Sequence, residues 1–305
     1  MPDNVYMKVI GENLNVINKT IGRAFKEKEP QPIREMAEKL TAAGVDFIDI
    51  NLGPARKGGE ELMTWVVQTV QEVTDTPLSL DTSNIDAMAA GLKVCQKKAI
   101  MNSIMARPER YEKMLPICAR HGANFIALMW GSTGMARDAN ERAELTTELL
   151  SMAQANGIPM SNVWVDPIVT PVNIQQNQLM YNLEFFEMLP DIVAAIDPET
   201  GPSKSTNGLS NISNGAPDHL RPILNQTYLC MLARKGMYSC ILDGFDPIIM
   251  DICRGKRQDI VDLVYGVMDG REYDYSTMDK EAVDYVKTAK VILGHTLFSD
   301  SWLEI

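Results

Sequence analysis

Aspartate and asparagine recur along the chain, each at or just after the end of a short apolar run. Carboxylates accept hydrogen bonds, and carboxamides both donate and accept them. The set holds no lysine for a Schiff base and no histidine for proton transfer. It therefore favours the binding of a flat heterocycle with alternating donors and acceptors, such as a 2-amino-4-oxopyrimidine edge. In chain order the residues are Glu12, Asn13, Asn15, Asp49, Asn51, Asp81, Asn84, Asn102, Asp166, Asn211 and Asp243.

Two other interpretations of these residues stay open at the level of sequence. An aspartate or asparagine after a strand is often the N-cap of the next helix, and Asp81-Thr82-Ser83-Asn84 fits that role. Several converging oxygens would also suit Mg²⁺ or Ca²⁺. We expect a binding site that holds no metal.

The elements that must position these residues follow a regular alternation. Stretches with helical spacing fill the gaps between apolar runs; one of them opens at Pro32 and ends before Gly44, and another covers 141–155. Eight β/α units predict an α/β fold, a single (β/α)8 TIM barrel whose active site lies at the carboxyl ends of the strands. A doubly wound sheet is the competing interpretation, disfavoured by the even unit length. The expected strands are 5–10, 47–51, 77–81, 99–102, 125–130, 163–166, 208–211 (the weakest) and 240–243.

Length and composition limit the classes of function. The 305 residues are expected to form one barrel domain over 1–305, with an extra C-terminal helix over 280–292. A net charge of −11 argues against nucleic acid or an anionic membrane surface as partner. Five scattered cysteines indicate reduced thiols, and we expect a cytoplasmic protein with no signal peptide and no membrane span.

Six short motifs in order carry a resemblance to a known family. The sequence resembles the pterin-binding methyltransferases, which move a methyl group between tetrahydrofolate and a corrinoid protein, as in acetogenic and demethylase systems. The likeness runs from about residue 8 to about residue 300. The motifs are Gly11-Glu12-Asn13-Leu14-Asn15, Asp49-Ile50-Asn51-Leu52-Gly53-Pro54, Leu80-Asp81-Thr82-Ser83-Asn84, Met101-Asn102-Ser103, Val165-Asp166-Pro167-Ile168 and Gly208-Leu209-Ser210-Asn211-Ile212-Ser213.

The resemblance implies a role for each matching residue. Asp81, Asn102 and Asp166 would hold the pterin edge, and Asn211 would hydrogen-bond N5, the atom that carries the methyl group. One family arginine is replaced by Gln226, and the loop 201–207 differs, so contacts from these places are not transferred. Further candidate site residues, with weaker support, are Glu12, Asn13, Asp49, Asn51, Ser213, Arg221 and Asp243.

The resemblance also implies a reaction and a partner. The substrate would be tetrahydrofolate or 5-methyltetrahydrofolate, and the cobalamin (corrinoid) would be carried by a separate corrinoid protein. None of the three histidines, His121, His219 and His295, stands in a D-x-H-x-x-G motif that could ligate cobalt. We expect a homodimer that acts in one-carbon metabolism or in O-demethylation or another demethylation.

Two rival functions stay open. A dihydropteroate synthase-like enzyme would use the same pterin site, but it needs a basic site for the diphosphate that leaves, and residues 242–246 are acidic. A non-catalytic pterin-binding subunit of a methyltransferase complex is the other, and the presence of Asn211 argues against it.

Overall fold

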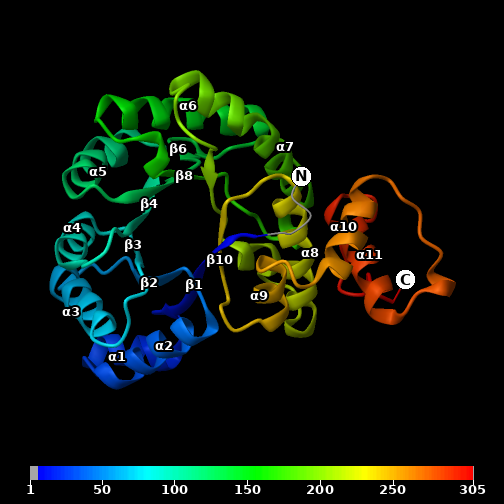
Figure 1. Ribbon diagram of the computed structural model, residues 1–305, viewed down its shortest axis with the longest axis horizontal. Coiled ribbons are helices and arrows are strands. Elements are labelled where there is room, and N and C mark those ends of the chain that lie inside the picture. The colour runs from blue at the N-terminus through cyan, green and yellow to red at the C-terminus, as the bar shows by residue number, and fades with distance from the viewer. Residues whose placement is uncertain (1–5, 305) are drawn as a thin grey trace.

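The strands of the protein form a nearly closed parallel barrel surrounded by helices, as Figure 1 shows for the computed structural model, which describes residues 6–304. The order of the hydrogen-bonded strands is β10-β1-β2-β3-β4-β5-β8-β9. This confirms the (β/α)8 barrel and rules out the doubly wound sheet. The strands are β1 (Lys8–Asn15), β2 (Phe47–Gly53), β3 (Leu78–Thr82), β4 (Ile100–Met105), β5 (Asn124–Leu128), β8 (Val163–Asp166), β9 (Lys204–Ser205) and β10 (Ser239–Leu242).

The gap between β9 and β10 is spanned by few contacts. Gly208 and Ile241 form an isolated parallel bridge, and the Ile241 amide donates to the carbonyl of Asn207 at 2.8 Å. The Ser239 hydroxyl donates to the carbonyl of Ser205 at 2.8 Å. These contacts bring the chain around residue 208 next to the last strand.

The helix predicted from Pro32 begins at Pro30 and the one predicted over 141–155 begins at Ala139, and both end where the sequence predicts. α2 has prolines in its first turn and ends at Gly44, whose φ of 82° is the left-handed conformation that glycine adopts at low cost. Asn84 caps α4 by accepting from the amides of Asp86 and Ala87. The barrel helices are α1 (Lys19–Glu27), α2 (Pro30–Ala43), α3 (Gly59–Gln71), α4 (Ile85–Val94), α5 (Pro108–His121), α6 (Ala139–Ala155), α7 (Val172–Ile196), α8 (Arg221–Arg234) and α9 (Pro247–Cys253).

The seventh strand lies earlier in the chain than the expected 208–211. The strand is Lys204–Ser205, and Leu209–Ser213 forms a 3-10 helix, η2, in place of the expected strand 208–211. Leu209 and Ile212 are buried three residues apart, which is the spacing of a 3-10 helix and not of a strand. Asn211 therefore lies on a helical turn beyond the sheet.

Other strands differ in extent as well, with β2 ending at Gly53 and β4 at Met105, past the expected 51 and 102. β1 runs from Lys8 to Asn15, well past the expected 5–10, and Val5 lies outside the described residues. The expected strand 125–130 ends at Leu128. The chain then forms a small antiparallel hairpin of β6 (Trp130–Gly131) and β7 (Gly134–Met135).

Apolar side chains from several strands fill the interior of the barrel. Trp164 packs edge-on against Phe47 and Tyr238, with ring centroids 5.4 Å and 5.1 Å away. Such layers of inward side chains close the floor of a barrel. The rest of this buried cluster is Ile10, Ile100, Ile126 and Ile241.

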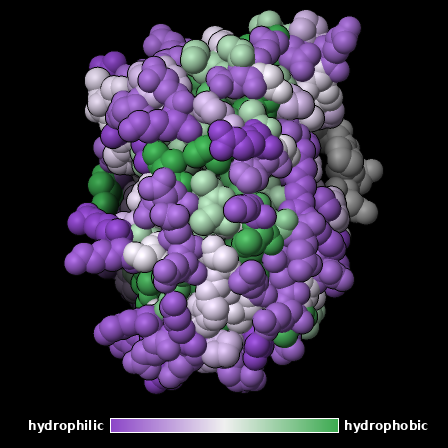
Figure 2. All heavy atoms as spheres, turned by 90° about the vertical axis from the view of Figure 1, so that its left-hand side faces the viewer, coloured by the Kyte–Doolittle hydropathy of each residue, from purple (hydrophilic) through white to green (hydrophobic). Residues whose placement is uncertain are grey.

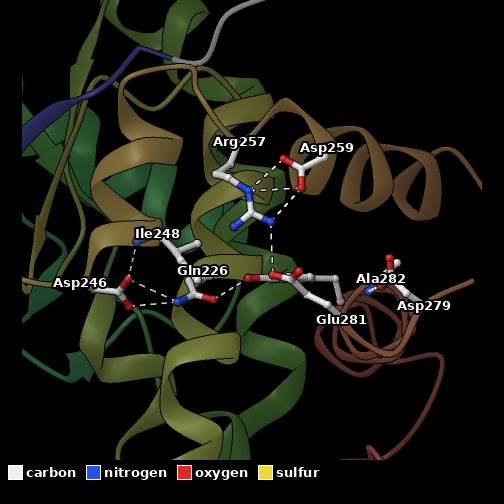
Figure 3. A network of polar contacts seen from close by, with 9 residues as sticks. Gln226, Asp246, Ile248, Arg257, Asp259, Asp279, Glu281 and Ala282 are labelled. Atoms are coloured by element: carbon white, nitrogen blue, oxygen red, sulfur yellow. Dashed lines mark hydrogen bonds and ion pairs between the residues drawn. The ribbon is translucent and has the colours of Figure 1, made fainter.

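The last part of the chain lies outside the ring of helices. α10 (Gln258–Met268) and α11 (Lys280–Ile292) pack on α8, to the right in Figure 1, and α11 has the bounds predicted for the extra helix. Figure 3 shows Arg257 between Asp259 and Glu281, which it contacts at 2.7 Å and 3.2 Å. This ion-pair cluster joins the start of α10 to the start of α11.

The outer face formed by α3, α4 and α5 is mostly hydrophilic. Figure 2 shows small hydrophobic areas scattered among polar side chains on this face. A groove of about 810 Å³ lies here, and its lining includes Trp65, Ala89 and Lys93. No strand residue lines it, so it is separate from the strand ends. Among residues 6–304, no helix combines the length and the apolar character needed to span a membrane.

Candidate functional site

The barrel interior changes from apolar to polar at the carboxyl ends of its strands. Side chains two residues apart on a strand point to the same side. On three strands an inward apolar residue of the floor is therefore followed two positions later by a polar side chain. On β3 the buried Ser79 is followed in the same way by Asp81. These pairs are Phe47 and Asp49, Ser79 and Asp81, Ile100 and Asn102, and Trp164 and Asp166.

Register shifts occur where several of these polar residues lie. β1 and β2 shift between Gly11 and Leu14, and β2 and β3 between Asn51 and Gly53. β4 and β5 shift between Met101 and Ile104. Such bulges re-aim side chains and are common next to active sites. Glu12 lies within the shift between β1 and β2, while Asn51 and Asn102 each lie at the edge of a shift and both remain register partners of Asp81.

Asp49 and Asp81 form the centre of one polar cluster. Asp49 accepts at Oδ1 from the Ser79 hydroxyl at 2.6 Å and from Asn102 Nδ2 at 3.1 Å. Asp81 accepts from Asn51 Nδ2 at 2.5 Å. The structure thus brings together Asp49, Asn51, Asp81 and Asn102 from three adjacent strands.

Burial makes both carboxyl groups poor acids. Loss of hydration raises the pKa of Asp49 to about 6, against the two hydrogen bonds that favour its charge. The pKa of Asp81 lies well above its ordinary value because of burial and of the negative charge of Asp49. A ligand that donates N–H groups to Asp81 would relieve this penalty, which is the situation a pterin edge offers.

Asp166 lies at the end of β8 in a second cluster. Its Oδ1 accepts from Asn207 Nδ2 at 2.9 Å and from the Ile168 amide at 2.8 Å. The residue is 7% exposed, and burial raises its pKa to about 6. Asn207 is fully buried, and its Oδ1 has no hydrogen-bond partner within the described part of the chain.

Glu12 connects the end of β1 to the turn that carries Asn211. Its Oε2 accepts from the Ser210 hydroxyl at 3.2 Å. Burial raises the pKa of Glu12 to about 7, and the charges of Asp49 and Asp243 add to this, while Ser210 and Arg221 oppose it. A carboxyl group with this pKa exchanges its proton near neutral pH.

Asn211 is exposed at the rim on η2. Its Oδ1 accepts from Asn214 Nδ2 at 3.2 Å, and within residues 6–304 its own Nδ2 donates to no protein acceptor. The same turn holds Ser213, whose hydroxyl donates to the carbonyl of Ser210 at 3.1 Å and accepts from Arg221 Nε at 3.3 Å. The Asn211 amide group is therefore free to donate to a ligand.

Asn13 and Asp243 are brought together, but their polar groups bind each other. Asn13 Nδ2 donates to Asp243 Oδ1 at 2.6 Å, and its Oδ1 accepts from the Gly244 amide at 3.0 Å. These bonds join β1 to the segment after β10. Asp243 also accepts from the Phe245 amide at 2.9 Å, which leaves this pair less capacity for a ligand than Asp81 or Asp166.

Gln226, which replaces a family arginine, takes part in helix packing. Its Nε2 donates to Asp246 Oδ2 at 3.0 Å, as Figure 3 shows, and its Oε1 accepts from the Tyr285 hydroxyl at 2.6 Å. The side chain is 5% exposed. It ties α8 to the N-cap of α9 and to α11.

Two residues of the clusters, Ser79 and Asn207, and the nearby Arg142 are not among the residues predicted from the sequence. Ser79 precedes Asp81 by two positions, so strand periodicity could have found it. Asn207 lies two residues after the short strand β9 and was obscured because the strand was expected at 208–211. Arg142, from α6, offers no sequence signal. Within residues 6–304, no three His, Cys, Asp or Glu side chains are arranged to hold a metal ion.

Comparison with known proteins connects this geometry to a family. Residues 11–243 match the family described as pterin binding enzyme. A methylcorrinoid:tetrahydrofolate methyltransferase of Eubacterium limosum is 26% identical over 239 residues, covering 78% of this chain and 85% of that protein. The methionine synthase of Mycobacterium leprae is 26% identical over 280 residues, and this match covers 89% of this chain but 23% of that protein.

Solved structures show the same fold. A dihydropteroate synthase of Thermus thermophilus has a TM-score of 0.59 at 21% identity, over 87% of this chain and 94% of that chain. The dihydropteroate synthase of Xanthomonas albilineans has a TM-score of 0.60 at 17% identity, over 86% of this chain and 93% of that chain. At these identities the likeness concerns the fold alone.

Proposed function

Because this chain belongs to the family of pterin binding enzymes, we propose that it is a methyltransferase acting between N5 of tetrahydrofolate and the cobalt of a separate corrinoid protein. The observation that carries this proposal is the polar layer at the strand ends together with a free carboxamide on the adjoining turn. The similarity to a methylcorrinoid:tetrahydrofolate methyltransferase over most of both chains supports the choice of reaction.

In this proposal the two buried clusters hold the pterin. Asp81 accepts hydrogen bonds from the N–H groups of the 2-amino-4-oxopyrimidine edge. Asn102 hydrogen-bonds a neighbouring ring atom, and Asp166 accepts a hydrogen bond from the opposite part of the ring. Asn51 and Asp49 hold Asp81 and Asn102 in place through the bonds at 2.5 Å and 3.1 Å. Fixing the ring in one orientation removes rotational freedom before the reaction, which lowers the barrier by several kcal/mol in favourable cases.

Asn211 is assigned to N5. When the methyl group leaves, the N5–carbon bond breaks, N5 keeps the electron pair and must take up a proton. A carboxamide that donates more strongly to N5 as this charge develops stabilises the transition state. Asn211 cannot itself supply the proton, so the proton comes from solvent or through a chain of water. In the reverse direction Asn211 orients the lone pair of N5 toward the methyl group.

The remaining candidates support this turn. Glu12 accepts from Ser210, and Arg221 donates to Ser213, so both hold the backbone on either side of Asn211. Asn13 and Asp243 join the first and last strands below it. The corrinoid, when bound, supplies the cobalt that accepts or donates the methyl group. His121, His219 and His295 are all exposed, and none of them stands in a D-x-H-x-x-G motif, which supports a corrinoid carried by another protein.

The wider setting is also part of the proposal. We expect a homodimer, a single domain over 1–305, a cytoplasmic location and a role in one-carbon or O-demethylation metabolism. Sedimentation of the purified chain tests the dimer. The genes beside this one test the metabolic setting, because the barrel itself contacts only folate and cobalt.

One experiment separates the methyltransferase from its rivals. The protein is incubated with 5-methyltetrahydrofolate labelled with ¹³C in the methyl group and with cob(I)alamin, and the label is followed by NMR. Transfer of the label to cobalt supports the proposal. Binding of the folate without transfer favours a non-catalytic pterin-binding subunit.

A dihydropteroate synthase-like activity is tested in a parallel arm. Dihydropteroate synthases share this fold, but Asp243 and Asp246 near the last strand would repel a diphosphate. Formation of dihydropteroate from a pterin diphosphate and 4-aminobenzoate, with no methyl transfer in the first arm, would replace the proposal.

A further inference from the structure

Arg142 is a fully buried arginine whose hydrogen-bond acceptors are all neutral. It lies on α6, with 0% exposure. Its Nε donates to the Pro167 carbonyl at 2.8 Å, its Nη1 to the Asp138 carbonyl at 3.1 Å, and its Nη2 to Gln178 Oε1 at 2.8 Å. Within residues 6–304, none of its hydrogen-bond acceptors is a carboxylate. Burying an arginine without a hydrogen-bonded counter-charge is costly, so its positive charge must be balanced by carboxylates that it does not contact directly.

The guanidinium group holds the turn that follows Asp166. Pro167 accepts from Arg142, and the Ile168 carbonyl accepts from Asn182 Nδ2 at 2.8 Å. The Ile168 amide donates to Asp166 Oδ1. Ile168 has a φ of 69°, which β-branched residues rarely adopt. This turn is therefore fixed by its surroundings, and it directs the Asp166 carboxylate.

Arg142 is also the positive charge that acts on Asp166. It opposes the burial that raises the pKa of Asp166. The other titratable groups that face the two residues from β10 and α8 are Cys240 and Tyr228, and burial raises the pKa of both, so they are neutral. Asp138 and Glu141 face Arg142 from the start of α6. Arg142 thus adds a positive charge to the hydrogen bonds from the Ile168 amide and Asn207 that together oppose the effect of burial on Asp166.

We propose that Arg142 is a positioning residue for Asp166, which it aims through the Pro167 carbonyl and keeps ionised as an acceptor through its buried positive charge. The ligand that Asp166 accepts from is a pterin under the proposed function, and this inference rests on that assignment. The arrangement itself, a buried cation behind an acceptor carboxylate, does not depend on it.

The test compares variants that separate the charge of Arg142 from its hydrogen bonds. Arg142→Lys keeps a positive charge but cannot bridge the three acceptors, and Arg142→Met loses both. Aspartate ¹³Cγ NMR follows the titration of Asp166 in the ligand-free protein, with Asp166→Asn used for assignment. The wild-type midpoint is expected near 6. Arg142→Lys should stay close to it, and Arg142→Met should raise it by about one unit.

A second pair of variants, at Gln178, provides the test if an Arg142 variant does not fold. Gln178→Glu adds a carboxylate beside the guanidinium, and Gln178→Leu loses the same bond to the Arg137 carbonyl without adding charge. Gln178→Glu should raise the Asp166 midpoint, and Gln178→Leu should not. Tetrahydrofolate binding, measured by calorimetry at pH 8, should weaken about tenfold or more in both Arg142 variants, because the Pro167 carbonyl loses its donor.

The outcomes are distinguishable from those of the proposed function. An unchanged Asp166 midpoint in both Arg142→Met and Gln178→Glu would overturn the inference, and if Arg142→Met does not fold, Gln178→Glu decides alone. Wild-type affinity for tetrahydrofolate in folded Arg142→Met would overturn the positioning role. Failure of the wild-type protein to bind any folate would instead reject the proposed function, while the NMR titration still decides the electrostatic role of Arg142.

Discussion

Asn51 on β2 and Asp81 on β3 are register partners, and the Asn51 amide donates to the Asp81 carboxylate at 2.5 Å. The same two strands place Ser79 opposite Asp49, at 2.6 Å. Two carboxylates thus lie side by side, each supported by a neutral donor from the other strand. Burial and their mutual repulsion make it costly to ionise both carboxyl groups at once.

Asp81→Asn should weaken pterin binding and stabilise the fold. Loss of a charged acceptor costs about 1.5–3 kcal/mol, which is about 10- to 150-fold in Kd for tetrahydrofolate. The folded pKa of Asp81 is raised, so the folded protein binds this proton more tightly and its stability falls as pH rises above the ordinary value of 3.8. The variant should therefore melt at a higher temperature than wild type at pH 8 and lose this advantage in acid.

The control for this variant is Asp75→Asn, which changes an exposed aspartate before β3. It should alter neither property. If Asp81→Asn binds tetrahydrofolate as tightly as wild type in calorimetry, Asp81 does not contact the pterin.

Asn211→Ala should lower turnover far more than pterin affinity. Its amide donates to no protein group within residues 6–304, so its removal disturbs little in the free protein, while N5 loses its donor in the transition state. A loss of about 10²-fold in kcat with a small change in Kd is expected. Asn214→Ala, which removes only the partner of Asn211 Oδ1, is the matched control and should have a smaller effect. Equal losses of kcat and affinity in Asn211→Ala would refute this role.

The activity should change with pH around the pKa of Glu12, which burial raises to about 7. Below this pH Glu12 is protonated next to the Asn211 turn, where it can pass its proton to the water that protonates N5 during transfer from 5-methyltetrahydrofolate. The rate in this direction should therefore fall as pH rises through about 7. Glu12→Gln should remove this limb from the profile of kcat against pH. A limb at the same pH in the variant would assign it to another group.

Trp164→Ala should destabilise the barrel by about 3–5 kcal/mol, because it removes the largest side chain of the floor under the site. Chemical denaturation measures this loss. Trp130→Ala is the control, since Trp130 is 37% exposed on the rim hairpin. A similar small loss in both variants would mean that the floor can collapse around the missing ring.

The sequence predicts the type and order of the strands and helices better than the positions of individual elements and the contacts between them. Alternating apolar runs and helical spacing locate seven of the eight barrel strands and the helix over 280–292, since both patterns depend on burial that any barrel must provide. The polar strand ends of β2, β3, β4 and β8 follow from the same periodicity. The prediction of a strand at 208–211 is wrong because closure of the barrel there depends on contacts with β10, which the local sequence does not encode.

The finer parts of the site depend on distant contacts. Asn13 and Asp243 are 230 positions apart and bind each other, so their types alone could not reveal that they are paired. Gln226 departs from the family pattern in sequence, but its hydrogen bond with Tyr285 depends on where α11 packs. Arg142 reaches the Asp166 turn from α6, and only the folded chain brings the two together.

The most direct test of the central claim is the rate of methyl transfer from 5-methyltetrahydrofolate to cob(I)alamin, followed anaerobically by the absorbance of the two cobalamin forms. Wild-type protein should convert cob(I)alamin to methylcobalamin at a rate proportional to protein concentration, and Asn211→Ala at saturating folate should be about 10²-fold slower. Formation of methylcobalamin no faster than without protein, by a wild-type chain shown to bind the folate, would contradict the account.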